Sequence, residues 1–247
     1  MSNRPRNVFL RSLDEASFQA LESHFVSVDL AVGQQIHRAG DKLDWVYFPE
    51  TCLVSMVSTT ASGETVETSM VGLEGAAGLI EACGSGRAGL QAFIQVDGRA
   101  LRAPAFVVRD LAIRSEAFSA KLWALIEYQL YDSRRSGLCN ALHTVEQRLA
   151  RWLLECAERC GGRASLPLTQ EVLGYMLGVQ RTTVSTLAGQ LQRRGLISQT
   201  RGQVVIADPP GLENHACECR GVVRAERDRL GLSIDPGELR LISSNEI

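Results

Sequence analysis

The polar side chains best suited to chemistry lie in the stretch LTQEVLGYMLGVQRTTVSTLAGQLQRRGLI, residues 168–197. This stretch holds no pair of side chains that could act as nucleophile and base or as acid and base. Its guanidinium, hydroxyl and amide groups instead suit the edges of bases and the oxygens of phosphates. It therefore predicts a DNA-binding surface. With the segment that follows, we expect the contacts to come from Thr169, Gln170, Gln180, Arg181, Thr182, Thr183, Ser185, Thr186, Arg193 and Arg201.

Two helices joined by a tight turn would present these side chains. Thr169 can accept a hydrogen bond from the first free amides of a helix, and Gly178 offers the positive φ that ends it. A second helix would start near Arg181 and run to about Arg194, with one apolar and one polar face. The apolar face would hold Val184, Leu187 and Leu191, opposite Thr182, Thr186, Gly189 and Arg193.

An ordinary helical hairpin with a solvated face is the alternative to this helix-turn-helix. Gly174 and Gly178 stand where the helix-turn-helix requires them, which favours the DNA-binding motif. The following GLISQTRGQVVI has two short apolar runs around a glycine-containing turn, which predicts a two-stranded wing with Arg201 at its tip. GGRASLPL, ahead of the motif, adds a turn and another short strand. The unit is thus predicted to be a winged helix.

Charge supports this interpretation only locally. The 247-residue chain has a formal net charge of -2, which argues against a nucleic-acid binder. Residues 139–207, however, contain eight arginines and four glutamates, a local charge of +4. Because phosphate contacts dominate affinity for DNA, a basic segment in an acidic chain indicates where DNA would lie. A solvated helix surface would give a similar pattern.

Cysteine and histidine invite a metal or redox interpretation. One helical turn separates the members of two pairs, Cys139 with His143 and Cys156 with Cys160, and the tail adds His215, Cys217 and Cys219. The helical pairs are typical of small buried residues between helices. The segment HACEC could bind a soft metal or oxidise, but the sequence shows no fourth ligand. We therefore expect no metal site and no cofactor, and seven cysteines without a C-x-x-C pair indicate reduced thiols.

Catalysis and membrane insertion both lack support in the sequence. No nucleophile–base pair, carboxylate pair or complete metal site has a recognisable spacing, so we do not expect an enzyme. No apolar run approaches the roughly 18 to 20 residues of a membrane span, and MSNRPRNVFL lacks the apolar core of a signal peptide. We expect a soluble, cytoplasmic protein with no membrane partner.

The elements that must position the DNA-binding surface begin with strands. β-rich runs at 45–48, 52–58 and 65–71 are separated by turn residues. QAFIQVDGRALRAP then alternates apolar residues on both sides of Asp97 and Gly98, and Asp-Gly in this position predicts a hairpin. Many short strands without intervening helices predict an antiparallel barrel or jelly roll.

A largely helical segment connects these strands to the winged helix. It carries an apolar stripe that is a candidate dimer seam. The predicted dimer interface consists of Phe118, Leu122, Leu125, Ile126 and Gln129. Periodicity alone leaves open whether the stripe contacts a second copy or packs against the barrel of the same chain.

This order of elements resembles the Crp/Fnr family of bacterial transcription regulators, and VYFPETCLVSMV, CNALHTVEQRLARWLL, LTQEVLGYMLGVQR and CECR carry the resemblance. It covers roughly residues 8 to 225 and implies an α+β fold. The implied units are a cyclic-nucleotide-binding-like β-roll at 1–108, a connecting dimerisation helix at 109–138, a winged helix-turn-helix at 139–207 and a C-terminal extension at 208–247. It also implies a homodimer on a palindromic operator, and we expect RNA polymerase as a further partner.

Two departures from the family pattern bear on specificity. In the family, the recognition helix opens with an Arg, Glu and Thr run followed by a second Arg. Arg181 matches the first Arg, whereas Thr182 replaces the Glu and Thr186 replaces the second Arg. The operator best known for the family is therefore not expected here.

The second departure is in the sensor. Cyclic-nucleotide-binding members use a Gly-Glu pair and an Arg-Ser or Arg-Thr pair, but Leu79 follows Gly78 here and only Arg87 lies near the place of the second pair. Cyclic AMP is thus not the expected effector. We expect either an unknown small molecule or an apolar side-chain plug, in a pocket lined by Gly78, Leu79, Ile80, Arg87, Leu90 and Phe93.

These observations favour a sequence-specific transcription regulator. The alternative is a dimeric sensory or scaffold protein that uses the winged helix for protein contacts. Arginines at both the second helix and the wing favour the regulator, since a protein-binding winged helix need not keep cations at both places. The last stretch of the chain is predicted to be a flexible terminus.

Overall fold

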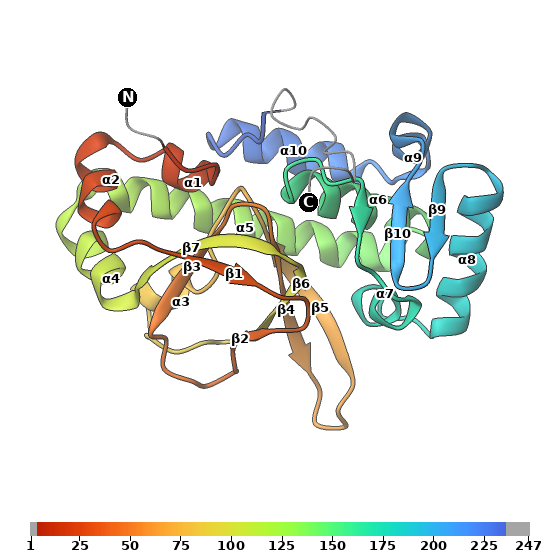
Figure 1. Cartoon of the computed structure of the whole chain (residues 1–247), viewed down its shortest axis with the longest axis horizontal. Helices are drawn as coiled ribbons and strands as arrows, with labels where there is room; N and C mark the ends of the chain where they lie inside the picture. The colour runs from red at the N-terminus through yellow and green to blue at the C-terminus, as the bar shows by residue number, and fades with distance from the viewer. Residues whose placement is uncertain (1–3, 236–247) are drawn as a thin grey trace.

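Two antiparallel sheets form the expected β-roll in the N-terminal half of the chain (Figure 1). The structure is a computed structural model and describes residues 4–235. One sheet has the strand order β1-β7-β3 and the other the order β2-β6-β4-β5. The strands are β1 Val26–Leu30, β2 Gln35–His37, β3 Trp45–Pro49, β4 Leu53–Thr59, β5 Thr65–Val71, β6 Gln91–Val96 and β7 Gly98–Pro104. The three runs predicted from 45 to 71 correspond to β3, β4 and β5.

Apolar side chains from both sheets fill the interior of the roll. The cluster consists of Leu30, Tyr47, Cys52, Val54, Met56, Val71, Ala77, Ala92, Ile94 and Ala100, all buried. Alternation along each strand directs these side chains inward, and their burial is the main source of stability for such a roll.

The hairpin predicted at Asp97 and Gly98 does not form. β6 pairs with β2 and β4, whereas β7 pairs with β1 and β3. At Gly98 the chain passes from one sheet to the other, and a Cβ there would lie 2.6 Å from Thr51 Oγ1. The Thr51 hydroxyl oxygen accepts a hydrogen bond from the backbone N–H of Arg99 at 2.8 Å. The Asp-Gly pair therefore makes a corner between sheets, and the hairpin prediction was wrong.

Three short helices occur in the region where the sequence indicated only strands and turns. They are α1 Val8–Arg11, α2 Glu15–Glu22 and α3 Leu79–Cys83, the last of them between β5 and β6. With 4, 8 and 5 residues, they are too short for helical periodicity to reveal. The expectation of strands without intervening helices was wrong for this reason.

A helical arm leaves the roll after Pro104. α4 spans Ala105–Arg114 and α5 spans Glu116–Leu142, with a break at Ser115, whose hydroxyl oxygen accepts a hydrogen bond from the N–H of Phe118. At about 1.5 Å per residue, the 27 residues of α5 extend roughly 40 Å, from the roll to the C-terminal region (Figure 1). Among the helices within residues 4–235, none is both long and apolar enough to cross a membrane.

The C-terminal region contains the winged helix and two further helices. A capping box of Thr144 and Gln147 starts its first helix. The elements are α6 Val145–Arg159, β8 Ser165–Leu166, α7 Gln170–Leu177, α8 Arg181–Arg193, β9 Ile197–Thr200, β10 Gln203–Ile206, α9 Pro209–His215 and α10 Cys219–Arg229. The strands form a small sheet of order β8-β10-β9. Residues 236–247, to which the prediction of a flexible terminus applies, lie outside the described residues.

A buried cation joins the C-terminal region to the roll. The guanidinium of Arg159, at the end of α6, donates to the carbonyl of Met70 at 2.7 Å and to Glu74 Oε1 at 3.1 Å. It also donates to Asp132 Oδ2 on α5 at 3.0 Å. Arg159 thus forms hydrogen bonds with β5, with the loop that follows β5 and with α5. These contacts fix the position of α6 relative to the roll and to the long helix.

Candidate nucleic-acid interface

The first helix of the predicted motif begins and ends at the expected residues. The side chain of Thr169 accepts a hydrogen bond from the N–H of Val172 at 3.2 Å, as an N-cap should. Gly178 ends the helix with φ 64° and ψ 38°, in the left-handed region that favours glycine. The sequence prediction for both ends of α7 is confirmed.

Gly174 permits the close approach of the turn to α7. Its carbonyl accepts a hydrogen bond from the N–H of Val179 at 3.0 Å. A Cβ at position 174 would lie only 3.0 Å from the carbonyl oxygen of Val179. A larger residue would push the turn, and with it the start of α8, away from α7.

α8 buries one face and exposes another. Val184, Ala188 and Leu191 are buried against α7 and the small sheet, while Leu187 is half-buried. The exposed side chains of its first half are Arg181, Thr182, Thr183, Ser185 and Thr186. The Thr186 hydroxyl donates to the carbonyl of Thr182 at 3.0 Å, which leaves its oxygen free to accept. This face is polar and built of short side chains, as entry into a major groove about 12 Å wide requires.

The wing lies beside the start of α8. β9 and β10 pair in register from Ile197 with Ile206 to Thr200 with Gln203, and Gly202 has a φ of 79° in the turn between them. Arg201 is exposed at the tip. A groove between wing and helices is lined by residues that include Thr169, Gln170, Arg181, Arg201 and Gly202. The structure thus brings residues from α7, α8 and the wing to one surface.

Half of the eight arginines counted in residues 139–207 do not contribute to this surface. Arg151 is buried against Glu155, and Arg163 pairs with Asp97. Arg159 is buried between α6 and the roll, where it pairs with Glu74. Arg148 donates to the carbonyl of Leu177 at 2.6 Å and so completes the end of α7.

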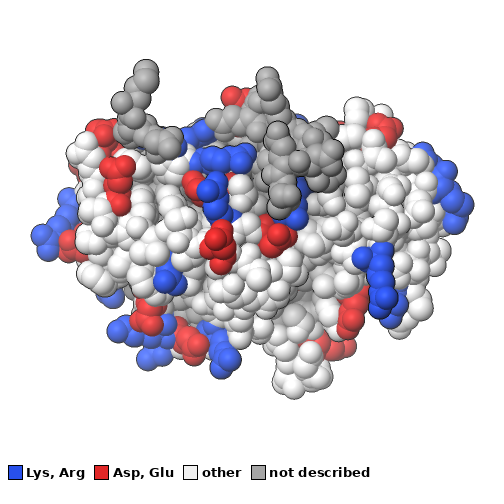
Figure 2. All heavy atoms as spheres, viewed as in Figure 1, with Lys and Arg blue, Asp and Glu red and all other residues white. Residues whose placement is uncertain are grey.

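The arginines that remain at the surface are those of α8 and the wing. Arg194 is partly engaged by Glu146 at 2.8 Å. Within residues 4–235, no ion pair involves Arg181, Arg193 or Arg201. Figure 2 shows Lys and Arg side chains over the end of the molecule where α8 lies in Figure 1. The basic surface is therefore smaller than the sequence count suggests, but it coincides with the predicted recognition helix.

Comparison with known proteins identifies the domain type. Residues 147–215 match the model of the Crp-like helix-turn-helix domain. The fold matches a transcriptional regulator of the Crp/Fnr family from Eubacterium rectale, with a TM-score of 0.63, 18% identity and coverage of 83% of this chain and 95% of that one. FixK2 from Bradyrhizobium japonicum matches with a TM-score of 0.66 and 21% identity over 78% and 98% of the two chains. The chain has the fold of a Crp/Fnr transcription regulator.

Among curated proteins, electron transport regulator A of Shewanella oneidensis is 23% identical over 184 residues, which cover 71% of this chain and 72% of that protein. This similarity is too distant to transfer an effector or a target.

The predicted dimer seam does not face outward in this Crp/Fnr fold. Phe118, Leu122 and Leu125 are buried against the roll of the same chain, and Ile126 packs against the same cluster. Gln129 lies beside Gly75 and is half-buried. Phe118, Leu122 and Leu125 thus correspond to the alternative, packing against the barrel of the same chain, whereas a dimer contact through the half-buried Ile126 and Gln129 stays a prediction.

The predicted effector-pocket residues do not converge either. Leu79 is buried in the cluster between roll and α5, Leu90 packs against the interior of the roll, and Phe93 packs against the winged-helix core. Arg87 is exposed and donates to the carbonyl of Gly40 at 2.9 Å. Gly78, with φ 80°, caps α3, which contains Leu79 and the half-buried Ile80. Leu79, Leu90 and Phe93 therefore belong to three separate apolar clusters, and the assignment of these residues to an effector pocket or to an apolar plug stays a prediction.

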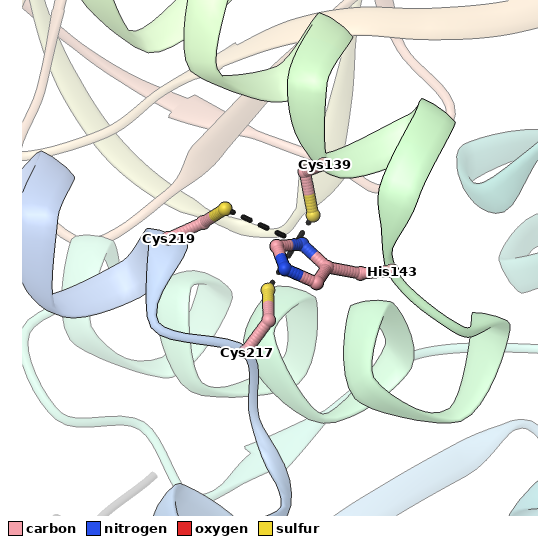
Figure 3. A group of neighbouring side chains, drawn as sticks. All are labelled: Cys139, His143, Cys217 and Cys219. Atoms are coloured by element: carbon pink, nitrogen blue, oxygen red, sulfur yellow. Dashed lines mark hydrogen bonds between the residues drawn. The ribbon is translucent and has the colours of Figure 1, made fainter.

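The fold assembles cysteines and a histidine that the sequence shows only as separate pairs. Cys139 and His143, at the end of α5, meet Cys217 and Cys219, near the start of α10 (Figure 3). Sequence reasoning found no fourth ligand because the two halves are 78 residues apart. The shared signal was the unusual density of Cys and His at both places.

Proposed function

We propose that this protein is a sequence-specific DNA-binding transcription regulator that binds a palindromic operator as a homodimer. The observation that carries the proposal is the polar outer face of α8, where Arg181 and Arg193 are exposed and Arg201 is adjacent on the wing. Arginine can donate two hydrogen bonds to guanine, and the neighbouring threonines and serine suit bases or phosphates. Arg201 would anchor a phosphate beside the half-site.

An exposed row on α5 supports the homodimer. It consists of Ala120, Trp123, Glu127, Leu130, Arg134, Gly137 and Ala141, which we call the outer face of α5. Trp123 is 66% exposed and Leu130 is 48% exposed. The alternating spacing of three and four residues is that of a two-helix seam, and the small residues would allow close approach. A second copy would remove these apolar side chains from water.

The effector is proposed to be something other than cyclic AMP, or no small molecule at all. Apolar side chains fill the interior of the roll, and Leu79 is fully buried where a ribose-binding glutamate would stand in the family. RNA polymerase is the natural partner of a regulator that activates transcription, and this contact is part of the proposal.

Footprinting on genomic fragments tests the proposal. Two recognition helices related by a two-fold axis should protect inverted half-sites with centres about 34 to 36 Å apart. The double variant Arg181→Ala with Arg193→Ala should lose the footprint, whereas Arg99→Ala, an exposed arginine on the roll, should retain it. Protection of a single unrepeated half-site, or a protein that stays monomeric at micromolar concentration, would contradict the proposal.

A scaffold protein whose winged helix binds another protein is the second candidate. Its specific support is the modest size of the basic surface described above. A chain that shifts no genomic fragment at low salt, yet dimerises normally, would favour this alternative, since electrostatic DNA binding strengthens as salt falls.

A further inference from the structure

Four potential metal ligands meet where α5 ends and α10 begins. Cys139 lies in the last turn of α5, and His143, four residues later, is the C-cap that follows its final residue, Leu142. Cys217 lies in the segment between α9 and α10, and Cys219 is the first residue of α10. Figure 3 shows the four side chains pointing toward one another.

The spacing of the ligand atoms suits one ion. The three Sγ atoms and the imidazole nitrogen all lie within 4.8 Å of one another. The sulfurs of Cys139 and Cys217 are 3.4 Å apart, and Cys219 Sγ lies 3.5 Å from His143 Nδ1. Tetrahedral zinc, with Zn–S near 2.3 Å and Zn–N near 2.0 Å, places its ligand atoms about 3.5 to 3.8 Å apart. A cluster of several iron atoms would hold the cysteine sulfurs further apart.

The site is closed to solvent. Cys139 and Cys219 are fully buried, Cys217 is 4% exposed, and the three form an apolar cluster of their own. The side chain of His143 is 14% exposed. Four protein ligands that are almost entirely buried are typical of structural zinc sites, whereas catalytic sites keep a position for water.

Neighbouring charged groups would orient the imidazole of His143 and offset the negative charge of the thiolates. Glu218 Oε2 lies 3.2 Å from His143 Nε2, so the carboxylate can accept a hydrogen bond from the Nε2–H. This leaves Nδ1, which faces Cys219, as the ligand atom. The guanidinium of Arg135 lies 3.7 Å from the carboxylate of Glu218. Three thiolates on a divalent ion carry one net negative charge, and this guanidinium offsets it.

We propose that Cys139, His143, Cys217 and Cys219 bind one zinc ion in a closed, four-coordinate structural site. The ion would tie the segment leading into α10 to the end of α5. Because Thr144, the N-cap of α6, directly follows His143, the site would also fix the junction between the long helix and the winged helix. The proposal does not depend on DNA binding, since its test measures metal content.

Elemental analysis of protein purified without chelators is the first measurement. We expect about one zinc per chain, lost in Cys219→Ser and in Cys139→Ser and retained in Cys83→Ser, which alters a cysteine outside the cluster. Glu218→Gln should keep the ligands but weaken zinc binding roughly 10- to 100-fold, because it removes the carboxylate partner of His143.

Cobalt substitution gives a measurement that does not rely on variants. Reconstitution of the wild-type chain with Co²⁺ should produce intense visible bands of a tetrahedral site and a sulfur-to-cobalt charge-transfer band.

A chelator should lower the Tm of the wild type and leave that of Cys219→Ser unchanged. Wild-type protein with free thiols and no bound metal, a Cys139–Cys217 disulfide found by non-reducing mass spectrometry, or iron in place of zinc would each overturn the proposal.

Discussion

The indole Nε1 of Trp152 on α6 donates a hydrogen bond to Oε1 of Glu67 on β5 across 2.6 Å. Ser55 on β4 donates to the other oxygen of the same carboxyl group and also contacts the sulfur of Met176 on α7. One acidic side chain of the roll is thus linked to the first helix of the C-terminal region, and through Ser55 to the helix-turn-helix. A displacement of the strand pair β4–β5 would therefore move side chains that contact α6 and α7 of the predicted DNA-binding unit.

The first prediction concerns the protonation of Glu67. Burial raises the pKa of Glu67 to about 7, although the hydrogen bonds from Ser55 and Trp152 oppose the shift. Because the folded state holds this proton more tightly than the unfolded state, the free energy of unfolding should fall as pH rises from about 4.5 to about 7 and then level off. Glu67→Gln should flatten this part of the profile, in urea titrations at a series of pH values. An unchanged slope in Glu67→Gln would show that the carboxyl group does not titrate there.

The second prediction separates base recognition from phosphate anchoring. Arg181→Ala should cost about 1 to 3 kcal/mol on the preferred operator and relax base choice in that half-site, because a bidentate base contact is lost. Arg201→Ala should weaken binding to all sequences alike. Competition binding against operator and random DNA measures both. Equal loss on the two DNAs in Arg181→Ala would indicate an electrostatic role for this residue.

The third prediction concerns the outer face of α5. Trp123→Glu should convert the dimer to a monomer and abolish cooperative operator binding, because two charges would meet in the seam. Ile113→Glu on α4 is the matched control, since Ile113 is 75% exposed and lies outside that face. Sedimentation velocity at micromolar concentration distinguishes the two states. A dimer that survives Trp123→Glu would place the contact elsewhere.

The fourth prediction concerns Glu158 on α6, which accepts hydrogen bonds from Arg220, Arg224 and Arg227 on α10. Burial alone would raise the pKa of Glu158, but Arg227 and Arg220 outweigh it and hold the pKa below its usual range. Glu158→Gln would leave the buried guanidinium groups of Arg220 and Arg227 with only their more exposed carboxylate partners, Glu213 and Asp228, and should cost at most about 3 to 5 kcal/mol of stability.

The matched control for that variant is Glu226→Gln, which removes a more exposed partner of Arg229 on the same helix and should change stability little. Chemical denaturation measures both variants. Because the pKa of Glu158 is depressed, its contribution should also be lost as pH falls through that depressed value. Equal stabilities for the two variants would mean that the buried cluster is not coupled to folding.

The fifth prediction is that cyclic AMP and cyclic GMP do not bind at micromolar concentration. Loss of the charge-assisted phosphate contact and of the ribose acceptor typically costs several kcal/mol, or a factor of hundreds or more in affinity. Calorimetric titration gives the answer directly. Micromolar binding together with a rise in operator affinity would restore a cyclic nucleotide as the effector.

Short-range features of this protein could be predicted from the sequence alone. The cap at Thr169, the left-handed residue at Gly178 and the β-rich runs of β3 to β5 depend on preferences within a few residues. Their physical causes, a side chain reaching an amide or a glycine free of Cβ, are encoded locally. The winged helix and its exposed polar face were therefore visible before the fold was known.

Only the tertiary structure decided which strands pair with one another and which element covers each apolar helix face. Asp97 and Gly98 have the local preference for a hairpin, but β7 pairs with β1 and β3 in the opposite sheet. Periodicity revealed the stripe from Phe118 to Ile126 without revealing what covers it. The cysteine cluster joins residues 78 positions apart. Such contacts depend on how whole elements pack, because burial is a property of the assembled chain and has no local signature.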